Sequence, residues 1–342
     1  MNKNLIVRLL THKEYSLWDE IVNKCPHGTI FQTSLWLSAC EKLLGTKLNI
    51  YAIYSNYELK GGCPIFEKSL YKFISIAQST GPMTPYGGYI FDLSESRQIR
   101  NLESSQRDMI YNINIEMERK FKYISIVNSP GFIDIRPFIS CGWNEQVQYT
   151  YALGLNNEIE RTISKKARNS AKKAAKLGFR CNPCSDPDIY YELFCKTFLR
   201  QNINPHVTEG FIKGMLDMIL KNRIGEFWIA ESASGEIAAA EIIIWDTKQA
   251  HRWSAASDPR FKETGAASLL LLEMMKYLNE RGHRAINLMG GNRPNLSKFV
   301  TSFNPCLIPY YSLYKFSLAP RFSNIIFKRI RRSLLRGCAA AV

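Results

Sequence analysis

Long hydrophobic runs are absent from this sequence. The apolar run nearest its start, Leu5 to Leu10, is short and is interrupted by Arg8. A secretory signal needs a longer uncharged stretch, and a membrane-spanning helix needs about 18 apolar residues. The sequence therefore predicts neither, and we expect a protein of the cytoplasm.

Clustered metal ligands are missing as well. The nine cysteines, an odd number, are scattered along the chain, and the five histidines are isolated from one another. Cys181 and Cys184 form one CxxC pair, but a tetrahedral zinc site needs a second Cys or His pair at suitable spacing. We therefore expect reduced thiols and no metal.

Acidic residues are absent from two segments that are rich in Lys and Arg. Residues 161–180 hold eight basic side chains, residues 321–336 hold six, and the formal net charge is +15. Such a charge favours an anionic partner. Base-stacking aromatic patterns of the RNP type and zinc-finger spacings are lacking, so nucleic acid is not the expected partner.

The length of 342 residues favours two domains, which we place at 1–150 and 151–318, followed by a tail at 319–342. Apolar periodicity predicts an α/β chain in which each half contains a hairpin, a further strand, a helix and another strand. This recurrence indicates an internal duplication. In the first half, a helix is expected to begin after Thr33 or Ser34 and to end at Gly45.

The second half begins with a basic helix at about 158–177. Two helices follow at about 186–200 and 208–222, and then a hairpin in which EFWIAES and EIAAAEIIIWD are joined by a Gly-containing turn. A strand at 249–257, a long apolar helix ending at Gly282, the strand AINLMGG and a short helix at about 295–303 complete the pattern.

The tail has an amphipathic pattern. Phe322, Ile326, Ile330 and Leu334 recur at intervals of four residues, with Arg and Lys on the other faces. Such a helix lies on an anionic membrane surface, or it packs on its own domain with a charged outer face. The sequence leaves both open.

The junction SAASDPRFKETGAASLLLLEMM carries the most specific pattern. Arg260, Lys262, Gly265 and Ala266 stand between a strand and a long helix. The first N–H groups of a helix have no partner within the helix, and its dipole puts partial positive charge there, so a pyrophosphate suits this position. From the spacing alone, an ordinary helix start that uses Gly265 for its turn is the simpler interpretation.

This junction resembles the acyl-CoA pyrophosphate loop of GNAT N-acyltransferases, whose pattern is Gln/Arg-x-x-Gly-x-Gly/Ala. The chain is also similar to the FemAB-related branch of that superfamily, because TIFQTSLWL, TPYGGYIFD, KKARNSAKKAAKLGF and NLMGG…SKFVTSFN occur in that order over most of residues 15–317. The resemblance implies two tandem GNAT-like domains, each with a mixed, mostly antiparallel sheet flanked by helices.

Three functions remain open. The resemblance implies transfer of an acyl group from acyl-CoA, a co-substrate and not a bound cofactor, to an amine of an anionic acceptor such as a sugar nucleotide or an envelope polysaccharide precursor. The first alternative is a peptidoglycan-bridge transferase that uses aminoacyl-tRNA, and the second is a non-catalytic scaffold of polysaccharide assembly at the inner membrane face. The tRNA-dependent relatives are expected to have Phe-Lys where this chain has Phe299-Val300, and Lys298 points to the opposite side of that helix.

Transfer to an amine needs a base, an oxyanion donor and an acid. Glu241 stands inside the apolar strand AAAEIIIW, where a carboxylate is either a satisfied polar group on a solvated face of the sheet or a base with a raised pKa. GNAT enzymes often use a Glu on this strand, so Glu241 is the candidate base, with His251 and Asp258 as further candidates. A backbone N–H near 253–257 is the expected oxyanion donor.

The acceptor side is assigned to residues outside that junction. Arg168 lies on the basic face that it shares with Lys172 and Lys176, although a solvated surface is the commoner role of such a face. NLMGG follows a strand but lacks GxGxxG and GxxxxGK[ST] patterns, so a nucleotide phosphate loop is not indicated. The candidate acceptor-binding residues are Arg168, Tyr86, Gly290, Asn292 and Lys298.

Overall fold

In the computed structural model, residues 5–70, 74–92, 98–199, 205 and 207–317 are described. They form two compact units, the first ending at Gln148 and resuming at Pro309, and the second spanning Tyr149–Ile308. The chain enters unit 2 within β7 (Asn144–Gly154) and returns to unit 1 within β13 (Cys306–Phe316). The expected boundary near 150 lies close to the first crossing, whereas residues 309–317, expected in the second domain, belong to unit 1. The tail at 319–342 lies outside the described residues.

Unit 1 is built on a sheet in the order β1-β2-β3-β4-β6-β13, with β5 beside β3. Neighbouring strands are antiparallel except β4 and β6, which are parallel. Residues 309–317 belong here because Ser312–Phe316 of β13 pair with Tyr123–Val127 of β6. The other strands are β1 (Leu5–Leu9), β2 (Lys47–Ser55), β3 (Glu58–Leu70), β4 (Ile74–Gln78), β5 (Ile90–Phe91) and β6 (Tyr123–Val127).

Helices pack on this sheet with caps that the sequence indicated. The Thr33 side chain accepts a hydrogen bond from the Trp36 N–H, and Gly45 is left-handed at the other end, which confirms the predicted limits of α2. The long helix α3 packs against β1 and β2. The helices of unit 1 are α1 (Tyr15–Lys24), α2 (Ser34–Leu44), α3 (Ile99–Lys120) and α4 (Arg136–Ser140), with short 3-10 turns η1 (His12–Glu14) and η2 (Ile30–Gln32).

Unit 2 repeats the same strand pattern. Its order is β8-β9-β10-β11-β12-β7, and every neighbouring pair is antiparallel except β11 and β12. In each unit the single parallel pair therefore stands between the fourth and fifth strands, which supports the predicted duplication. The strands are β8 (Arg180–Cys184), β9 (Gly225–Glu231), β10 (Ile237–Trp245), β11 (Ala250–Ser257) and β12 (Ala285–Asn287).

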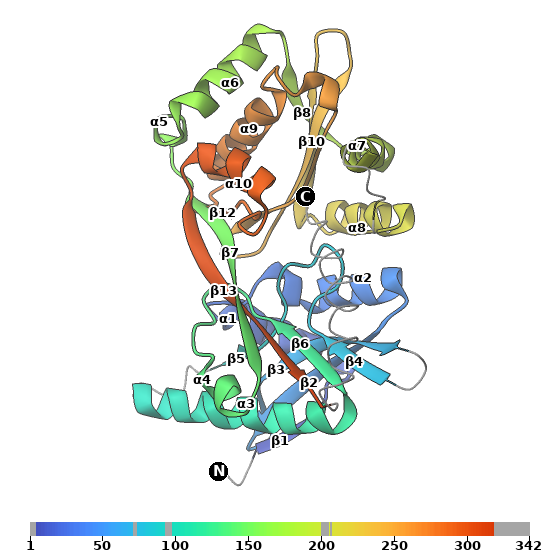
Figure 1. The fold of residues 1–342 in the computed structure, drawn as a ribbon, viewed down its shortest axis with the longest axis vertical. Coiled ribbons are helices and arrows are strands. Elements are labelled where there is room, and N and C mark those ends of the chain that lie inside the picture. Colours follow the sequence, from blue (N-terminus) through green and yellow to red (C-terminus); the bar gives the residue numbers. More distant parts are fainter. Residues whose placement is uncertain (1–4, 71–73, 93–97, 200–204, 206, 318–342) are drawn as a thin grey trace. The chain divides into compact units, whose positions relative to one another are not determined.

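Helices cover both faces of the unit 2 sheet (Figure 1). α7 packs on β11 and α8 on β9, whereas α9 packs on β9 and β10 from the other side with α6 against it. The expected basic helix is divided in two, because Ser164 leaves the helical conformation and caps a new helix at the Ala167 N–H. The helices are α5 (Ile159–Thr162), α6 (Lys165–Lys176), α7 (Pro187–Leu199), α8 (Glu209–Lys221), α9 (Ala266–Glu280) and α10 (Pro294–Val300), with η3 (Pro259–Phe261) and η4 (Thr301–Phe303).

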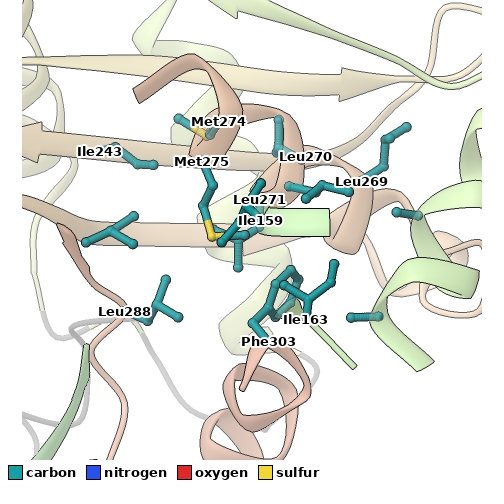
Figure 2. Packing of buried hydrophobic residues seen from close by; sticks show 14 of the residues in the cluster. Ile159, Ile163, Ile243, Leu269, Leu270, Leu271, Met274, Met275, Leu288 and Phe303 are labelled. Carbon is teal, nitrogen blue, oxygen red and sulfur yellow. The ribbon is translucent and has the colours of Figure 1, made fainter. Parts of the chain in front are cut away.

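One hydrophobic core cluster of unit 2 lies on the α9 face of its sheet. Figure 2 shows Leu270, Leu271 and Met275 of α9 converging with Ile243 of β10 and Phe303. Burial of such side chains is the main stabilising contribution to a fold of this kind. The apolar residues of α9 that the sequence placed in a long buried helix therefore have that role.

The predicted fold class is confirmed: the protein is α/β, with a mixed, mostly antiparallel sheet and flanking helices in each unit. Within the described residues, no helix has the length and apolar character to cross a membrane. The same part of the chain contains no cluster of three His, Cys, Asp or Glu side chains suited to a metal ion.

Candidate functional site

The parallel strands of unit 2, β11 and β12, pair over only two residues of each strand. β12 pairs with β11 only at Ala250–Ile286 and His251–Asn287, while β11 continues to Ser257. From Arg252 onward, β11 therefore has no ladder partner on that side among the described strands. β12 itself ends at Asn287, whereas β11 runs on toward the loop before α9. We call this unpaired side of β11, from Arg252 to Ser257, the β11–β12 wedge.

A β-bulge lies at the narrow end of this wedge. Ile242 pairs with Ser254 and Ile243 with Arg252, so Trp253 is the extra residue of β11. Bulges are frequent next to active sites, where they turn a backbone or side-chain group away from the ladder. The bulge lies at the start of the segment, near 253–257, in which the oxyanion donor is predicted.

Glu241 and Arg252 form a buried ion pair beside the bulge. Arg252 donates from Nε to Oε2 of Glu241 at 2.8 Å and from Nη2 to Oε1 at 2.7 Å. Their side chains are 1% and 4% exposed, respectively. Glu241 stands between Ala239 and Ile243, which belong to the core under α9, so it faces the α9 side of the sheet.

This pair changes the interpretation of Glu241. The sequence leaves open a polar group on a solvated sheet face or a base, but Glu241 is buried and both of its oxygens accept hydrogen bonds from Arg252. Removing one partner of such a pair leaves a buried unpaired charge, so the two residues depend on each other. The role of Glu241 as a base stays a prediction.

Arg252 is a candidate site residue that sequence reasoning missed. Its guanidinium carbon lies 5.4 Å from the ring centroid of Phe299 on α10. Nη1 is buried and has no hydrogen-bond partner among the described residues. The available signal was a basic residue inside the apolar strand AHRWSAAS, where an unpaired charge is costly.

His251, the next candidate, is paired at the other end of the β10–β11 hairpin. It is fully buried, and its Nε2 lies 3.1 Å from Oδ2 of Asp246. Burial alone would raise the pKa of Asp246, but the hydrogen bond and charge of His251, with the N–H groups of Lys248 and Gln249, lower it to about 2. Asp246 is therefore ionised and orients the imidazole.

Asp258 is bound by two cations. Arg260 donates to both of its oxygens, and Nζ of Lys196 lies 3.3 Å from Oδ2. The hydrogen bond from Arg260 is the main reason that the pKa of Asp258 falls to about 2, although burial opposes it. This carboxylate is thus a weak base, and Arg260, which also bonds Glu236, holds the loop in place.

The loop before α9 has the conformation that its sequence predicts. Gly265 is the N-cap, with φ of +87°, and a Cβ there would lie 2.1 Å from the Ser170 carbonyl oxygen of α6. The glycine is therefore needed for packing against α6 as well as for the turn. Nearby, Thr264 Oγ1 accepts from the Ala266 N–H at 3.2 Å, and Lys262 is exposed.

The predicted acceptor residue Arg168 has a structural contact. Its Nη1 donates to the carbonyl oxygens of Glu160, Arg161 and Ile163 at 2.7–3.0 Å. It thereby satisfies carbonyl groups at the end of α5. Lys173 of the same helix donates to the Glu263 carbonyl at 2.6 Å, so α6 is joined to the loop before α9.

The Gly-Gly pair of NLMGG serves local packing. Gly290 has φ of +76°, and a Cβ on Gly291 would lie 2.3 Å from the Tyr149 carbonyl oxygen. Asn292 accepts a hydrogen bond from the Tyr149 N–H at 2.8 Å. This turn is therefore fastened to β7, whereas Lys298 on the following helix is exposed.

Tyr86, a predicted acceptor-binding residue, and Val300, the position expected to be cationic in tRNA-dependent relatives, are both buried. Tyr86 lies in unit 1, is 1% exposed and packs edge-to-face against Phe31 and Tyr310. Val300 is fully buried in the core under α9. The position expected to be cationic in tRNA-dependent relatives is thus part of the apolar core here.

Comparison with known proteins agrees with this geometry. Residues 160–294 match the family model described as an acetyltransferase (GNAT) domain. No curated protein sequence matches the chain. The match spans α6 to α9 and the β11–β12 wedge, so Glu241, Arg252 and the loop before α9 lie inside the matched domain.

Solved structures share the fold over nearly the whole chain. FemX is 13% identical, with a TM-score of 0.69 over 94% of this chain and 99% of its own. L-PGS from Bacillus licheniformis is 12% identical, with a TM-score of 0.56 over 92% and 96%. A tandem GNAT protein from the clavulanic acid biosynthesis pathway is 11% identical, with a TM-score of 0.54 over 92% and 99%. Residues 160–294 therefore form a GNAT acetyltransferase domain, and the chain as a whole shares its fold with FemX and with a tandem GNAT protein.

Proposed function

We propose that this protein is an N-acyltransferase that moves an acyl group from acyl-CoA to an amine of an anionic acceptor. The observation that carries the proposal is the wedge beside β11. From the end of β11 the chain continues through the loop with Gly265 to the N-terminus of α9. GNAT proteins generally use acyl-CoA, and the acetyltransferase domain match includes this wedge.

The donor site follows from the physics of the α9 N-terminus. The dipole of α9 attracts a pyrophosphate to the N-terminus of the helix, and the adjacent Lys262 adds a positive charge that is exposed to solvent. Arg260 is bound to Asp258 and Glu236, so it shapes the loop. The thioester end of the donor then extends along β11 toward the bulge at Trp253.

The proposed acceptor is anionic because the chain is strongly basic. The exposed face of α6 carries Lys165, Lys166, Lys172 and Lys176, and the net charge is +15. A sugar nucleotide or a phosphorylated envelope precursor has the complementary charge. The likeness to FemX and L-PGS does not identify the acceptor, since identities of 13% and 12% support the shared fold alone.

The donor proposal is tested by calorimetric titration of the full chain with CoA. Lys262→Glu reverses the charge at the proposed pyrophosphate site and is expected to raise the Kd for CoA about tenfold or more, roughly 1.4 kcal/mol. Lys221→Glu, which makes the same change at an exposed position at the end of α8, is the matched control and should leave the Kd unchanged.

The result also separates the donors. Equal CoA affinity in all three proteins would contradict the assigned pyrophosphate site, and absence of CoA binding would contradict the acyl-CoA function. Transfer to amines that occurs only with charged tRNA would establish the aminoacyl-tRNA alternative, against which the buried Val300 argues. Gly265→Glu is unsuitable as a test, because any side chain there collides with α6.

A further inference from the structure

Arg252 is a buried cation that uses only some of its N–H donors in hydrogen bonds. Its residue exposure is 3%, and Nε and Nη2 bond Glu241 side by side. The guanidinium is a rigid planar fork, so Nη1 must point away from Glu241. This nitrogen is buried and has no partner within the described chain.

An unused buried donor of this kind needs an explanation. Most buried polar groups in proteins are hydrogen-bonded, and leaving a charged one unsatisfied is more costly than leaving a neutral one. Glu241 and Phe299 both hold the guanidinium in position, so it is oriented and not merely trapped. A ligand oxygen would satisfy Nη1.

The position of Arg252 along β11 indicates which part of the donor would reach it. Arg252 is the first residue past the last pair with β12 and immediately precedes the bulged Trp253. Ser257, at the α9 end of β11, is five residues away, which is about 16 Å along a strand. With the pyrophosphate at the α9 N-terminus, the pantetheine arm must span that distance, so the acyl thioester and not a phosphate comes to Arg252.

We propose that Arg252 donates from Nη1 to the carbonyl oxygen of the acyl thioester and stabilises the negative charge that develops there. This inference rests on the proposed acyltransferase function. The acceptor amine forms a C–N bond to the carbonyl carbon, and the carbonyl π electrons move to the oxygen beside Arg252. The C–S bond then breaks, CoA leaves as a thiolate, and the proton lost by the amine ends on that sulfur.

Within this arrangement Glu241 is a positioning residue. It fixes the fork and offsets the charge of Arg252, so the resting pair is formally neutral and can be buried. Preorganised donors aimed at a developing charge provide one of the largest contributions to catalysis. The cation beside Phe299 thus comes from β11, while the neighbouring Val300 stays in the apolar core.

The test compares binding of two probes, CoA and S-carboxymethyl-CoA, by calorimetry on the full chain. The carboxylate of the second probe places charged oxygens one bond beyond the position of the oxyanion. The wild type is expected to bind S-carboxymethyl-CoA about 10- to 100-fold more tightly than CoA. Arg252→Lys keeps a charge for Glu241 but lacks the second nitrogen, so it should lose this preference while its CoA affinity changes less than about twofold.

Two further variants separate folding from function. The double variant Glu241→Gln with Arg252→Gln leaves no buried charge unpaired and should behave as Arg252→Lys does. Arg136→Lys, on the exposed surface of unit 1, is the matched control and should keep the preference. Circular dichroism and thermal melting identify which variants are folded, and one folded variant at 252 is sufficient for the comparison.

Two results overturn the proposal in distinguishable ways. If CoA binds and the folded Arg252 variants keep the preference for S-carboxymethyl-CoA, Arg252 does not contact the acyl oxygen, while the acyltransferase proposal stands. If the wild type binds neither probe, the proposed function fails and the role of Arg252 fails with it. Loss of the preference with retained CoA affinity supports both.

Discussion

At the scale of single residues, the polar side chains inside the unit 2 sheet occur in partnered sets. Glu241 is paired with Arg252, His251 with Asp246, and Asp258 with Arg260. Each set satisfies groups that burial would otherwise make costly, so each is held in a fixed geometry. Stability and site geometry are therefore linked in this unit.

The Asp246–His251 pair makes a prediction about acid stability. The folded pKa of Asp246 is depressed to about 2, below the value near 3.9 of an unfolded chain. Its contribution, on the order of 2 kcal/mol, is thus fully present above pH 4 and is lost as the pH falls toward 2. Urea denaturation between pH 2 and 7 should show a weaker pH dependence for Asp246→Asn than for the wild type.

A matched variant makes that result specific. Asp217 is exposed on α8, so Asp217→Asn removes the same charge without a buried partner and should leave the pH dependence of the wild type unchanged. If Asp246→Asn and Asp217→Asn change the unfolding free energy equally at every pH, the buried pair does not stabilise the fold in the way we infer.

The residue scale also shows where sequence reasoning ends. Glu241, His251 and Asp258 could be selected because polar residues inside or at the ends of apolar strands need a reason. Their partners could not, because the Glu241–Arg252 contact depends on the register of the β10–β11 hairpin and on the bulge at Trp253. A shift of one residue would turn Arg252 to the other face.

At the scale of elements, local signals predicted most helices and their ends. The expected helices at about 186–200 and 208–222 correspond to α7 and α8, and the long helix before Gly282 corresponds to α9. The single basic helix expected at about 158–177 is the exception. It is divided into α5 and α6 because Ser164 interrupts the run of basic residues and caps a new helix. Whether a serine lies inside a helix or caps one is decided by packing, here with its N–H bonded to the Ser302 carbonyl.

That cap supports a prediction about α6. Ser164 Oγ accepts from the Ala167 N–H at 3.2 Å, so Ser164→Ala should lower the free energy of unfolding by about 1 kcal/mol. Ser164→Asp keeps an acceptor at the cap and places a negative charge at the helix N-terminus, so it should be tolerated. Chemical denaturation measures both, and equal destabilisation by the two substitutions would show that the cap is not the cause.

At the scale of the whole molecule, the two units have the same strand pattern, but only unit 2 is formed by one uninterrupted stretch of the described chain. Unit 2 is one continuous segment, Tyr149–Ile308, that contains β8 to β12 and the part of β7 that pairs with β12. Unit 1 obtains its last strand only after the chain has completed unit 2, when β13 pairs with β6. The sequence recurrence indicated the duplication, but it could not reveal this return because β13 follows unit 2 directly in the chain.

The discontinuity predicts which half folds alone. A fragment of residues 149–308 should be soluble and melt cooperatively, because it retains β8 to β12 and the part of β7 that pairs with β12. A fragment of residues 1–148 lacks β13, which leaves β6 as an open edge and removes Leu313, fully buried in the unit 1 core. It should therefore aggregate or melt without cooperativity, and fusing residues 306–317 to it through a flexible linker should restore a cooperative transition.

Circular dichroism and calorimetry of the three proteins test this prediction. A cooperative melt of residues 1–148 alone would show that β13 is dispensable and that unit 1 does not depend on the return of the chain.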